Sequence, residues 1–266
     1  MKKVCIIGLG WLGEPLGEFL LGKGYKVAGS TTSQEKIKLL NEKGLHCELL
    51  RVLEDTDTQQ ILKVIGDASV LVITIPPRRI PNIEEIYPAQ IKKIAQSVSG
   101  NSTIKVVFTG STSVYPSKNT IVKEEDIAPD KPSGVACLKA EQVLKSAFGE
   151  RLTTIRFAGL IGYERSPERI GKKRPITKSL DAPLNLIHLD DCINIICEII
   201  EKQKWGYTFN ACADEHPTRR AFDGLGGEAA EVNQNEYKIV DNSFLKESLS
   251  FEFKYKNPLD VKKYNA

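Results

Sequence analysis

An apolar segment that runs directly into a glycine-rich turn constrains the fold of this chain more than any other feature. Residues 4–7 are Val, Cys, Ile and Ile, and the glycines Gly8, Gly10 and Gly13 follow them. A short apolar run bounded by glycine is typical of a strand buried on both faces, as in a parallel sheet. Apolar residues then recur at helical spacing over residues 16–21. The chain is therefore predicted to begin with a strand, a tight turn and a helix.

Glycines at this spacing have separate roles in a turn that binds a dinucleotide. Gly8 permits the tight turn, Gly10 lets the backbone approach a pyrophosphate, and Gly13 lets the helix pack closely on the strand. The N–H groups and the dipole at the helix N-terminus hold the anion, so Trp11 and Leu12 are also expected to contact the cofactor. A structural turn without a ligand is the alternative. The position of the pattern, between a strand and a helix, favours the dinucleotide site.

The composition permits a large core and argues against a nucleic-acid partner. The chain has 266 residues, 41% of them hydrophobic, which is enough for one α/β unit with a smaller appended part. Its 37 basic and 34 acidic residues are too balanced to indicate binding to nucleic acid or to an anionic membrane. No apolar run approaches the ~20 residues that span a bilayer, and the beginning lacks a complete signal peptide. We expect a cytoplasmic protein that acts on a small molecule.

The cysteines and histidines do not have the spacing of metal ligands. No two cysteines form a CxxC pair, and His46, His188 and His216 are scattered along the chain. Several cysteines, among them Cys5 and Cys192, lie inside apolar runs. Reduced, buried thiols are therefore favoured over ligands or disulfides, and no metal site is expected.

The residues after the second predicted strand indicate which dinucleotide is favoured. That strand covers residues 25–29 and is followed by four hydroxyl side chains, Ser30, Thr31, Thr32 and Ser33. An NAD site usually carries Asp or Glu here to bind the ribose 2′-hydroxyl, and this chain has neither. Hydroxyl groups instead suit a 2′-phosphate, with Lys36 supplying positive charge. The sequence favours NADP over NAD, although Ser33 also fits a helix N-cap.

Strands and helices alternate through the first half of the chain. Apolar runs predict strands at 45–52, 70–75 and 104–109, with helices at 56–64 and 83–98. This alternation is typical of an α/β doubly wound parallel sheet, the Rossmann architecture. Pro76 and Pro77 end the strand at 70–75, because proline cannot continue a ladder. They are expected to line the adenine or ribose side of the cofactor.

A cluster of hydroxyl residues after the strand at 104–109 carries a resemblance to a known family. Residues 110–116 read Gly-Ser-Thr-Ser-Val-Tyr-Pro. This run resembles the Ser/Thr-x-x-Val-Tyr-Gly run of the extended short-chain dehydrogenase/reductases, which include nucleotide-sugar epimerases and dehydratases. Pro116 replaces the usual glycine. The resemblance implies that Ser111, four residues before Tyr115, is the catalytic Ser/Thr that polarises a substrate oxygen.

Later segments extend the resemblance over most of the chain. Residues 154–162 look like the family's sixth strand and the loop that closes over the nicotinamide, which implies a cofactor contact for Phe157. Residues 186–191 look like the family's Ile-His-x-Asp-Asp element. Ile-Pro-Pro at 75–77 and Pro-Thr-Arg-Arg at 217–220 are most similar to an atypical, YeeZ-like branch of NAD(P)-binding proteins. The expected division is a Rossmann domain, 1–156, and a smaller substrate-side part, 157–266, interleaved with it.

The chain departs from the family at its catalytic pair. The family carries Tyr-x-x-x-Lys on the helix after strand five, in which the Lys binds the nicotinamide ribose and lowers the pKa of the proton-donating Tyr. Lys139 matches the lysine, but Val135 stands at the tyrosine position. Tyr115 is then the nearest candidate donor, ahead of Cys137 and Glu124, although a structural role in the Val-Tyr turn is the alternative. Chemistry without such an acid, or binding without turnover, also stays open.

The leading hypothesis is an NADP-dependent oxidoreductase or epimerase-like enzyme, and the alternative is a non-catalytic NADP-binding sensor or scaffold. The substrate class is a small polyol or carbonyl compound, phosphorylated or linked to a nucleotide. A basic loop at 165–174 fits a nucleotide diphosphate, unless it is merely a solvated loop. A packing role is expected for His188, and an edge strand at 251–257. By analogy with the family, helices 83–98 and 135–148 are expected to form a homodimer.

Overall fold

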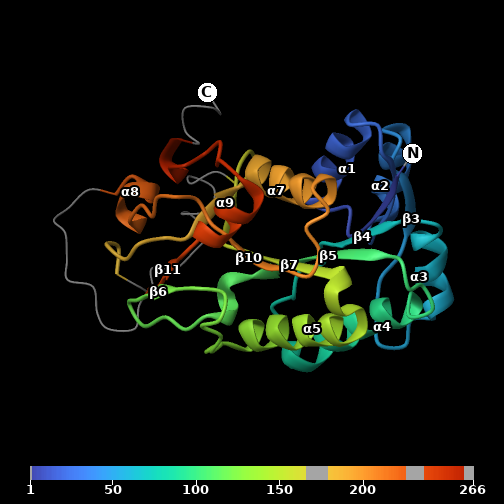
Figure 1. The fold of residues 1–266 in the computed structure, drawn as a ribbon, viewed down its shortest axis with the longest axis horizontal. Helices are drawn as coiled ribbons and strands as arrows, with labels where there is room; N and C mark the ends of the chain where they lie inside the picture. Colours follow the sequence, from blue (N-terminus) through green and yellow to red (C-terminus); the bar gives the residue numbers. More distant parts are fainter. Residues whose placement is uncertain (1, 166–178, 226–236, 261–266) are drawn as a thin grey trace. The chain divides into compact units, whose positions relative to one another are not determined.

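The structure, a computed structural model, describes residues 2–165, 179–225 and 237–260 (Figure 1). Its strands are β1 (Lys3–Ile7), β2 (Lys26–Thr31), β3 (His46–Leu49), β4 (Val70–Ile73), β5 (Lys105–Ser111), β6 (Ile121–Val122), β7 (Leu152–Phe157), β8 (Gly159–Ile161), β9 (Leu186–His188), β10 (Thr208–Ala211) and β11 (Ile239–Val240). Its helices are α1 (Gly13–Gly22), α2 (Gln34–Glu42), α3 (Thr58–Ile65), α4 (Ile83–Ser97), α5 (Pro132–Phe148), α7 (Leu189–Glu201), α8 (Arg219–Asp223) and α9 (Ser243–Leu249).

A seven-stranded sheet has the order β10-β7-β5-β4-β1-β2-β3. Strand β1 pairs in parallel with β2 on one side and with β4 on the other, so the strand order reverses at β1. Ligands of open α/β sheets bind outside the carboxyl ends of the strands at such a reversal. The predicted α/β doubly wound fold is confirmed, and its reversal point lies where β1 enters the glycine turn.

Two compact units divide the chain, each built from separate stretches. The first unit comprises residues 1–110, 131–155 and 196–208, and the second comprises 111–130, 156–195 and 209–266. One boundary between them falls next to the division expected after residue 156. Segment 111–130, however, belongs to the second unit, and segment 196–208 belongs to the first. A single division after residue 156 would place each of them in the other unit.

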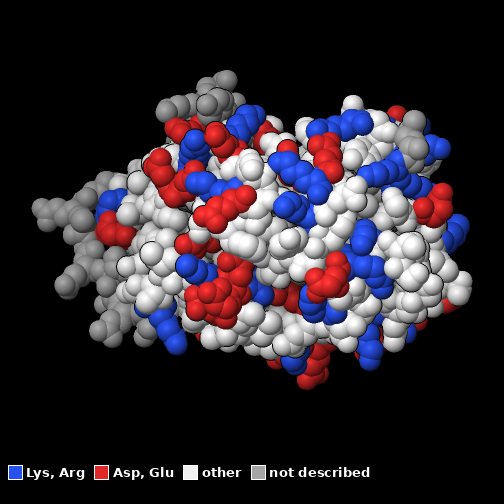
Figure 2. All heavy atoms as spheres, viewed as in Figure 1, with Lys and Arg blue, Asp and Glu red and all other residues white. Residues whose placement is uncertain are grey.

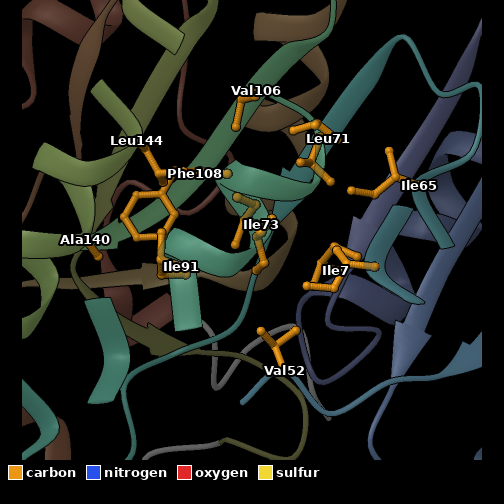
Figure 3. Close-up of a cluster of buried hydrophobic side chains, with 14 of the residues drawn as sticks. Ile7, Val52, Ile65, Leu71, Ile73, Ile91, Val106, Phe108, Ala140 and Leu144 are labelled. Atoms are coloured by element: carbon orange, nitrogen blue, oxygen red, sulfur yellow. The ribbon is translucent and has the colours of Figure 1, made fainter. Parts of the chain in front are cut away.

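The first unit has a core on each face of its strands. Cys5 and Ile7 point from β1 into a buried cluster with side chains of α3, α4 and α5, shown in Figure 3. Ile6 points to the other face, where a Cβ on Gly17 of α1 would lie 3.6 Å from its Cδ1. Helices α1 and α2 accordingly lie on the opposite side of the strands from α4 and α5 (Figure 1). Burial on both faces explains why the strands are apolar without alternation.

The second unit contains two parallel strand pairs, β8 with β9 and β6 with β11. The edge strand expected at 251–257 is wrong, because this segment forms no strand over a stretch that the structure describes throughout. The alternation is real, since Phe251, Phe253 and Tyr255 are buried. Two backbone N–H groups of this segment, however, donate to a side chain and not to another strand. Asp191 accepts the N–H of Lys254 at 2.8 Å and that of Tyr255 at 3.1 Å.

Charged side chains of both signs are interspersed over the face drawn in Figure 2. This mixed surface agrees with the balanced composition, which gives a formal net charge of +3. Within the described part of the chain, no helix is both long and apolar enough to cross a membrane. All six cysteines are buried thiols.

Candidate functional site

The glycine turn between β1 and α1 is tightly folded. Gly8 has a φ of 113°, a conformation that L side chains rarely adopt. Its carbonyl oxygen accepts the N–H of Gly10 at 2.7 Å, and the N–H of Leu9 donates to the carbonyl oxygen of Ser30 at 2.6 Å. The turn is therefore fixed by its own backbone and by the end of β2.

Packing inside the protein accounts for two of the three glycines. A Cβ on Gly13 would lie 2.1 Å from the carbonyl oxygen of Gly8, a contact that no side chain tolerates. A Cβ on Gly8 would lie 2.8 Å from Thr74 Oγ1, in addition to the backbone strain. Gly8 and Gly13 thus have the roles that the sequence predicts for the turn and for helix packing.

Gly10 is different, because none of the residues that the structure describes requires a glycine there. A Cβ on Gly10 would meet one atom within 4 Å, the carbonyl oxygen of Gly8 at 4.0 Å. Gly10 is exposed, and its φ is outside the left-handed region. The space above it is open, as the close approach of a pyrophosphate requires.

The N-terminus of α1, three residues after Gly10, has no side-chain cap. Leu12 is the N-cap residue and makes no side-chain hydrogen bond to the first turn, whose described residues include one acid, Glu14. Trp11 is partly buried and Leu12 is buried. The partial positive charge of the helix end and its backbone N–H groups favour an anion here.

Three hydroxyl groups bind carbonyl oxygens where β1 and β4 end. Thr109 of β5 donates to Ile73 at 3.1 Å, Thr74 donates to Gly8 at 2.7 Å, and Tyr87 of α4 donates to Ile75 at 2.7 Å. Burial, with smaller contributions from the nearby thiol of Cys137 and carboxyl of Glu141, raises the pKa of Tyr87 well above its usual value. The phenol therefore stays protonated and donates its hydrogen bond. This bond holds the carbonyl group of Ile75, the residue directly before Pro76 and Pro77.

The hydroxyl residues at the end of β2 are less accessible than expected. Ser30 and Thr31 belong to the strand and are 2% and 7% exposed, while Thr32 is exposed. Thr31 Oγ1 accepts the N–H of Ser33, which is the N-cap residue of α2 but makes no side-chain cap. Lys36, the residue expected to supply charge to a phosphate, lies on the first turn of α2 and donates to Glu14 Oε2 at 3.1 Å.

Gly29 is a residue of this region that sequence reasoning missed. A Cβ there would lie 2.6 Å from the carbonyl oxygen of Ile6 and 2.9 Å from the side chain of Leu9. Gly29 lets β2 approach the base of the glycine turn closely. A glycine inside an apolar strand pattern is the signal that could have revealed it.

The rotation of helix α5 about its own axis was not predicted from the sequence. A Cβ on Gly110 would lie 2.9 Å from Glu141 Oε1, so Glu141 packs against the end of β5. At about 100° per residue, Cys137 lies about 40° from Glu141 around the helix, whereas Lys139 lies about 160° from it. Lys139 is exposed and Cys137 is buried. That Lys139 binds a ribose stays a prediction.

Tyr115 lies at the centre of a buried network in the second unit. Its hydroxyl donates to Asn210 Oδ1 at 2.6 Å and accepts from an Arg156 N–H at 2.7 Å. Glu124 accepts the backbone N–H of Asn210 at 2.8 Å, and burial raises the pKa of this carboxyl. Lys238 donates to the carbonyl oxygen of Tyr115 at 2.6 Å. These contacts favour the structural role of Tyr115, and proton donation by it stays a prediction.

Two other predicted site residues lie at strand ends. Ser111 is the last residue of β5, is partly buried, and accepts the N–H of Ser113 on its Oγ at 3.1 Å. Phe157 is the last residue of β7 and is 4% exposed. Their catalytic and cofactor roles stay predictions.

His188 has the packing role that was expected at the start of α7. Its ring lies 3.7 Å from the ring of Tyr255, centroid to centroid, and burial lowers its pKa to about 4. The imidazole is therefore neutral near pH 7. Asp191 is fully buried at the N-terminal end of α7, where burial raises its pKa to about 6 despite the two backbone N–H groups that it accepts.

The basic loop at 165–174 lies, except for Arg165, outside the described residues. Among the residues that the structure describes, no group of three or more His, Cys, Asp and Glu side chains could hold a metal ion.

Comparisons with known proteins show the family to which this chain belongs. A model of the NAD dependent epimerase/dehydratase family matches residues 4–212. Protein YeeZ from Escherichia coli (strain K12) is 35% identical, and the match covers 97% of this chain and 98% of that protein. The chain belongs to the NAD dependent epimerase/dehydratase family, as its motifs indicate, and it resembles the YeeZ branch.

Solved structures share the fold at low sequence identity. A dTDP-glucose 4,6-dehydratase from Bacillus anthracis, in complex with NAD, has a TM-score of 0.79 at 17% identity and matches over 99% of this chain and 96% of that one. A UDP-glucuronic acid 4-epimerase from Bacillus cereus, also in complex with NAD, has a TM-score of 0.74 at 17% identity over 99% and 100% of the two chains. A functionally unknown conserved protein from Silicibacter pomeroyi has a TM-score of 0.76 at 19% identity over 100% and 98%.

Proposed function

We propose that this protein binds a nicotinamide dinucleotide at the glycine turn, with NADP preferred over NAD, and acts as an epimerase-like oxidoreductase. Its substrate is a small polyol or carbonyl compound or a nucleotide-linked sugar. The family and the sugar-nucleotide names of the structural neighbours support this class. The preference for NADP is supported by the absence of an acidic residue directly after β2 and by Lys36 nearby.

Open space over Gly10 is the observation that carries the proposal. Packing explains Gly8 and Gly13, but a Cβ on Gly10 would have only one atom near it, at 4.0 Å. A pyrophosphate that approaches the backbone closely at this position would require a residue without a side chain. The adjoining N-terminus of α1, which Leu12 does not cap, fits the pyrophosphate of that ligand.

The chain's own residues have distinct roles in this proposal. The turn from Gly8 to Gly13 holds the pyrophosphate, and the N-terminus of α1 stabilises its charge. When bound, a nicotinamide supplies hydride donor or acceptor chemistry. Ser111 donates a hydrogen bond to the substrate oxygen, so that charge developing there is stabilised. The general acid is not assigned to Tyr115, because Asn210 and Arg156 already occupy its hydroxyl.

Loss of turnover on substitution of Ser111 tests the enzymatic part. The purified protein is incubated with NADPH and a panel of sugar nucleotides and carbonyl compounds, and absorbance loss is followed. We expect Ser111→Ala to lower kcat by about a hundredfold, the order seen when one oxyanion donor is removed. Ser99→Ala is the matched control, since Ser99 is an exposed serine that bonds to its own helix end. Equal rates for the wild-type protein and Ser111→Ala would contradict the assignment.

A cofactor sensor or scaffold is the second candidate function, favoured by the absence of a Tyr-x-x-x-Lys pair on α5. Val135 has no proton to donate, and Lys139 is exposed on a different stripe from Glu141. Tight NADPH binding without turnover over the whole panel would support the sensor.

The hydroxyl of Thr74 gives a further test of the binding site. Thr74→Val removes the donor to Gly8 and keeps a similar volume, so we expect the free energy of unfolding to fall by about 1 kcal/mol. Because that bond fixes the glycine turn, dinucleotide affinity should also fall by about three- to tenfold. Thr153→Val is the matched control, since Thr153 Oγ1 donates to the carbonyl oxygen of Lys204 at 2.7 Å, away from the turn. Similar affinity losses in both variants would contradict a positioning role for Thr74.

A further inference from the structure

Glu14, at the start of α1, holds two lysines of the segment that follows β2. Its Oε2 accepts from Lys36 at 3.1 Å, and its Oε1 accepts from Lys43 at 2.8 Å. Lys43 also bonds to Glu18 Oε1 at 2.5 Å. The side chain of Glu14 is 17% exposed, whereas that of Lys36 is 49% exposed. Glu14 is therefore the fixed partner and Lys36 the accessible one.

The charges of this group compensate one another. Burial raises the pKa of Glu14, but hydrogen bonds and charge from Lys43 and Lys36 outweigh it, and the net shift is downward. Glu14 is thus an anion at neutral pH, next to the N-terminus of α1. Two carboxylates and two ammonium groups leave no net charge in the group.

We propose that Glu14 sets the preference of the site between NADP and NAD by competing with the ribose 2′-phosphate for Lys36. This inference rests on the proposed function. Lys36 lies on the first turn of α2, shortly after the end of β2, where a Rossmann unit meets the adenosine ribose. A 2′-phosphate there has to share Lys36 with Glu14 or displace it, and it is repelled by the carboxylate. NADH carries no 2′-phosphate, so it does not compete with Glu14 for Lys36.

Calorimetric titration of NADPH and NADH into a set of variants tests the proposal. Glu14→Gln keeps the shape of the side chain and releases Lys36, so we expect NADPH to bind about three- to tenfold more tightly, with a smaller change for NADH. The gain should shrink at high salt, because the charges are partly exposed. Adding Lys36→Met to Glu14→Gln should remove the gain.

Glu18→Gln is the matched control, because Glu18 bonds to Lys43 and the structure gives it no ion pair with Lys36. The ratio of the two dissociation constants should stay at the wild-type value in this variant. The proposal is overturned if Glu14→Gln leaves that ratio unchanged, or shifts it no more than Glu18→Gln does. If the wild-type protein binds neither dinucleotide, the proposed function fails as well, so the two failures can be told apart.

Discussion

Gly10→Val should abolish dinucleotide binding while leaving the protein folded. The valine side chain would occupy the open space over the turn, where the pyrophosphate backbone contact forms, and we expect affinity to fall by about a hundredfold or more. A Cβ at this position meets only the carbonyl oxygen of Gly8 at 4.0 Å, so the melting temperature should change by less than about 4 °C. Titration calorimetry and thermal unfolding of the same sample measure both quantities.

Gly22→Val is the matched control for this experiment. Gly22 ends α1 and, like Gly10, has open space around its missing side chain, with nothing within 4 Å. Its substitution should leave dinucleotide affinity unchanged. Retained affinity in Gly10→Val would show that the pyrophosphate lies elsewhere.

Gly13→Ala should have the opposite outcome, because it destabilises the fold itself. One added methyl group would lie 2.1 Å from the carbonyl oxygen of Gly8, which belongs to the backbone and cannot rotate away. Either α1 or the turn must move, and both are packed on the sheet. We expect the free energy of unfolding to fall by more than about 3 kcal/mol.

Urea unfolding of Gly13→Ala and Gly22→Ala compares two glycines of the same helix. Alanine is favoured over glycine inside a helix by about 1 kcal/mol, so Gly22→Ala should be neutral or slightly stabilising. A Gly13→Ala protein as stable as the wild type would contradict the close contact between α1 and the glycine turn.

Local patterns predicted most of the first unit. These patterns depend on residues that are neighbours along the chain, such as the apolar runs at 4–7 and 70–75 and the glycines between 8 and 13. The structure has strands and a turn at these places. Element ends were less accurate, because side chains distant in sequence decide them. The predicted strand at 70–75 ends at Ile73, and the carbonyl oxygen of Ile75 bonds to Tyr87 of α4.

Contacts between distant residues explain what the sequence could not predict about the site. Lys36 and Glu14 are 22 positions apart, and no spacing rule indicates that they form an ion pair. The segment 251–257 alternates like a strand, yet the carboxylate of Asp191, more than 60 positions away, accepts its N–H groups. Alternation reports which side chains are buried, and it does not report what the backbone bonds to.

The contact between Glu141 and Gly110 limits how the catalytic pair of the family could be installed in this chain. Because that contact fixes the rotation of α5, a tyrosine introduced at position 135 would lie on the same stripe as the exposed Lys139. Positions 133 and 137 are less suitable for such a pair, because Cys137 is buried and a lysine there would lose its contact with solvent. A protein engineer who seeks to give this scaffold the chemistry of its relatives would therefore begin from Val135, which is partly buried and lies about one turn before Lys139.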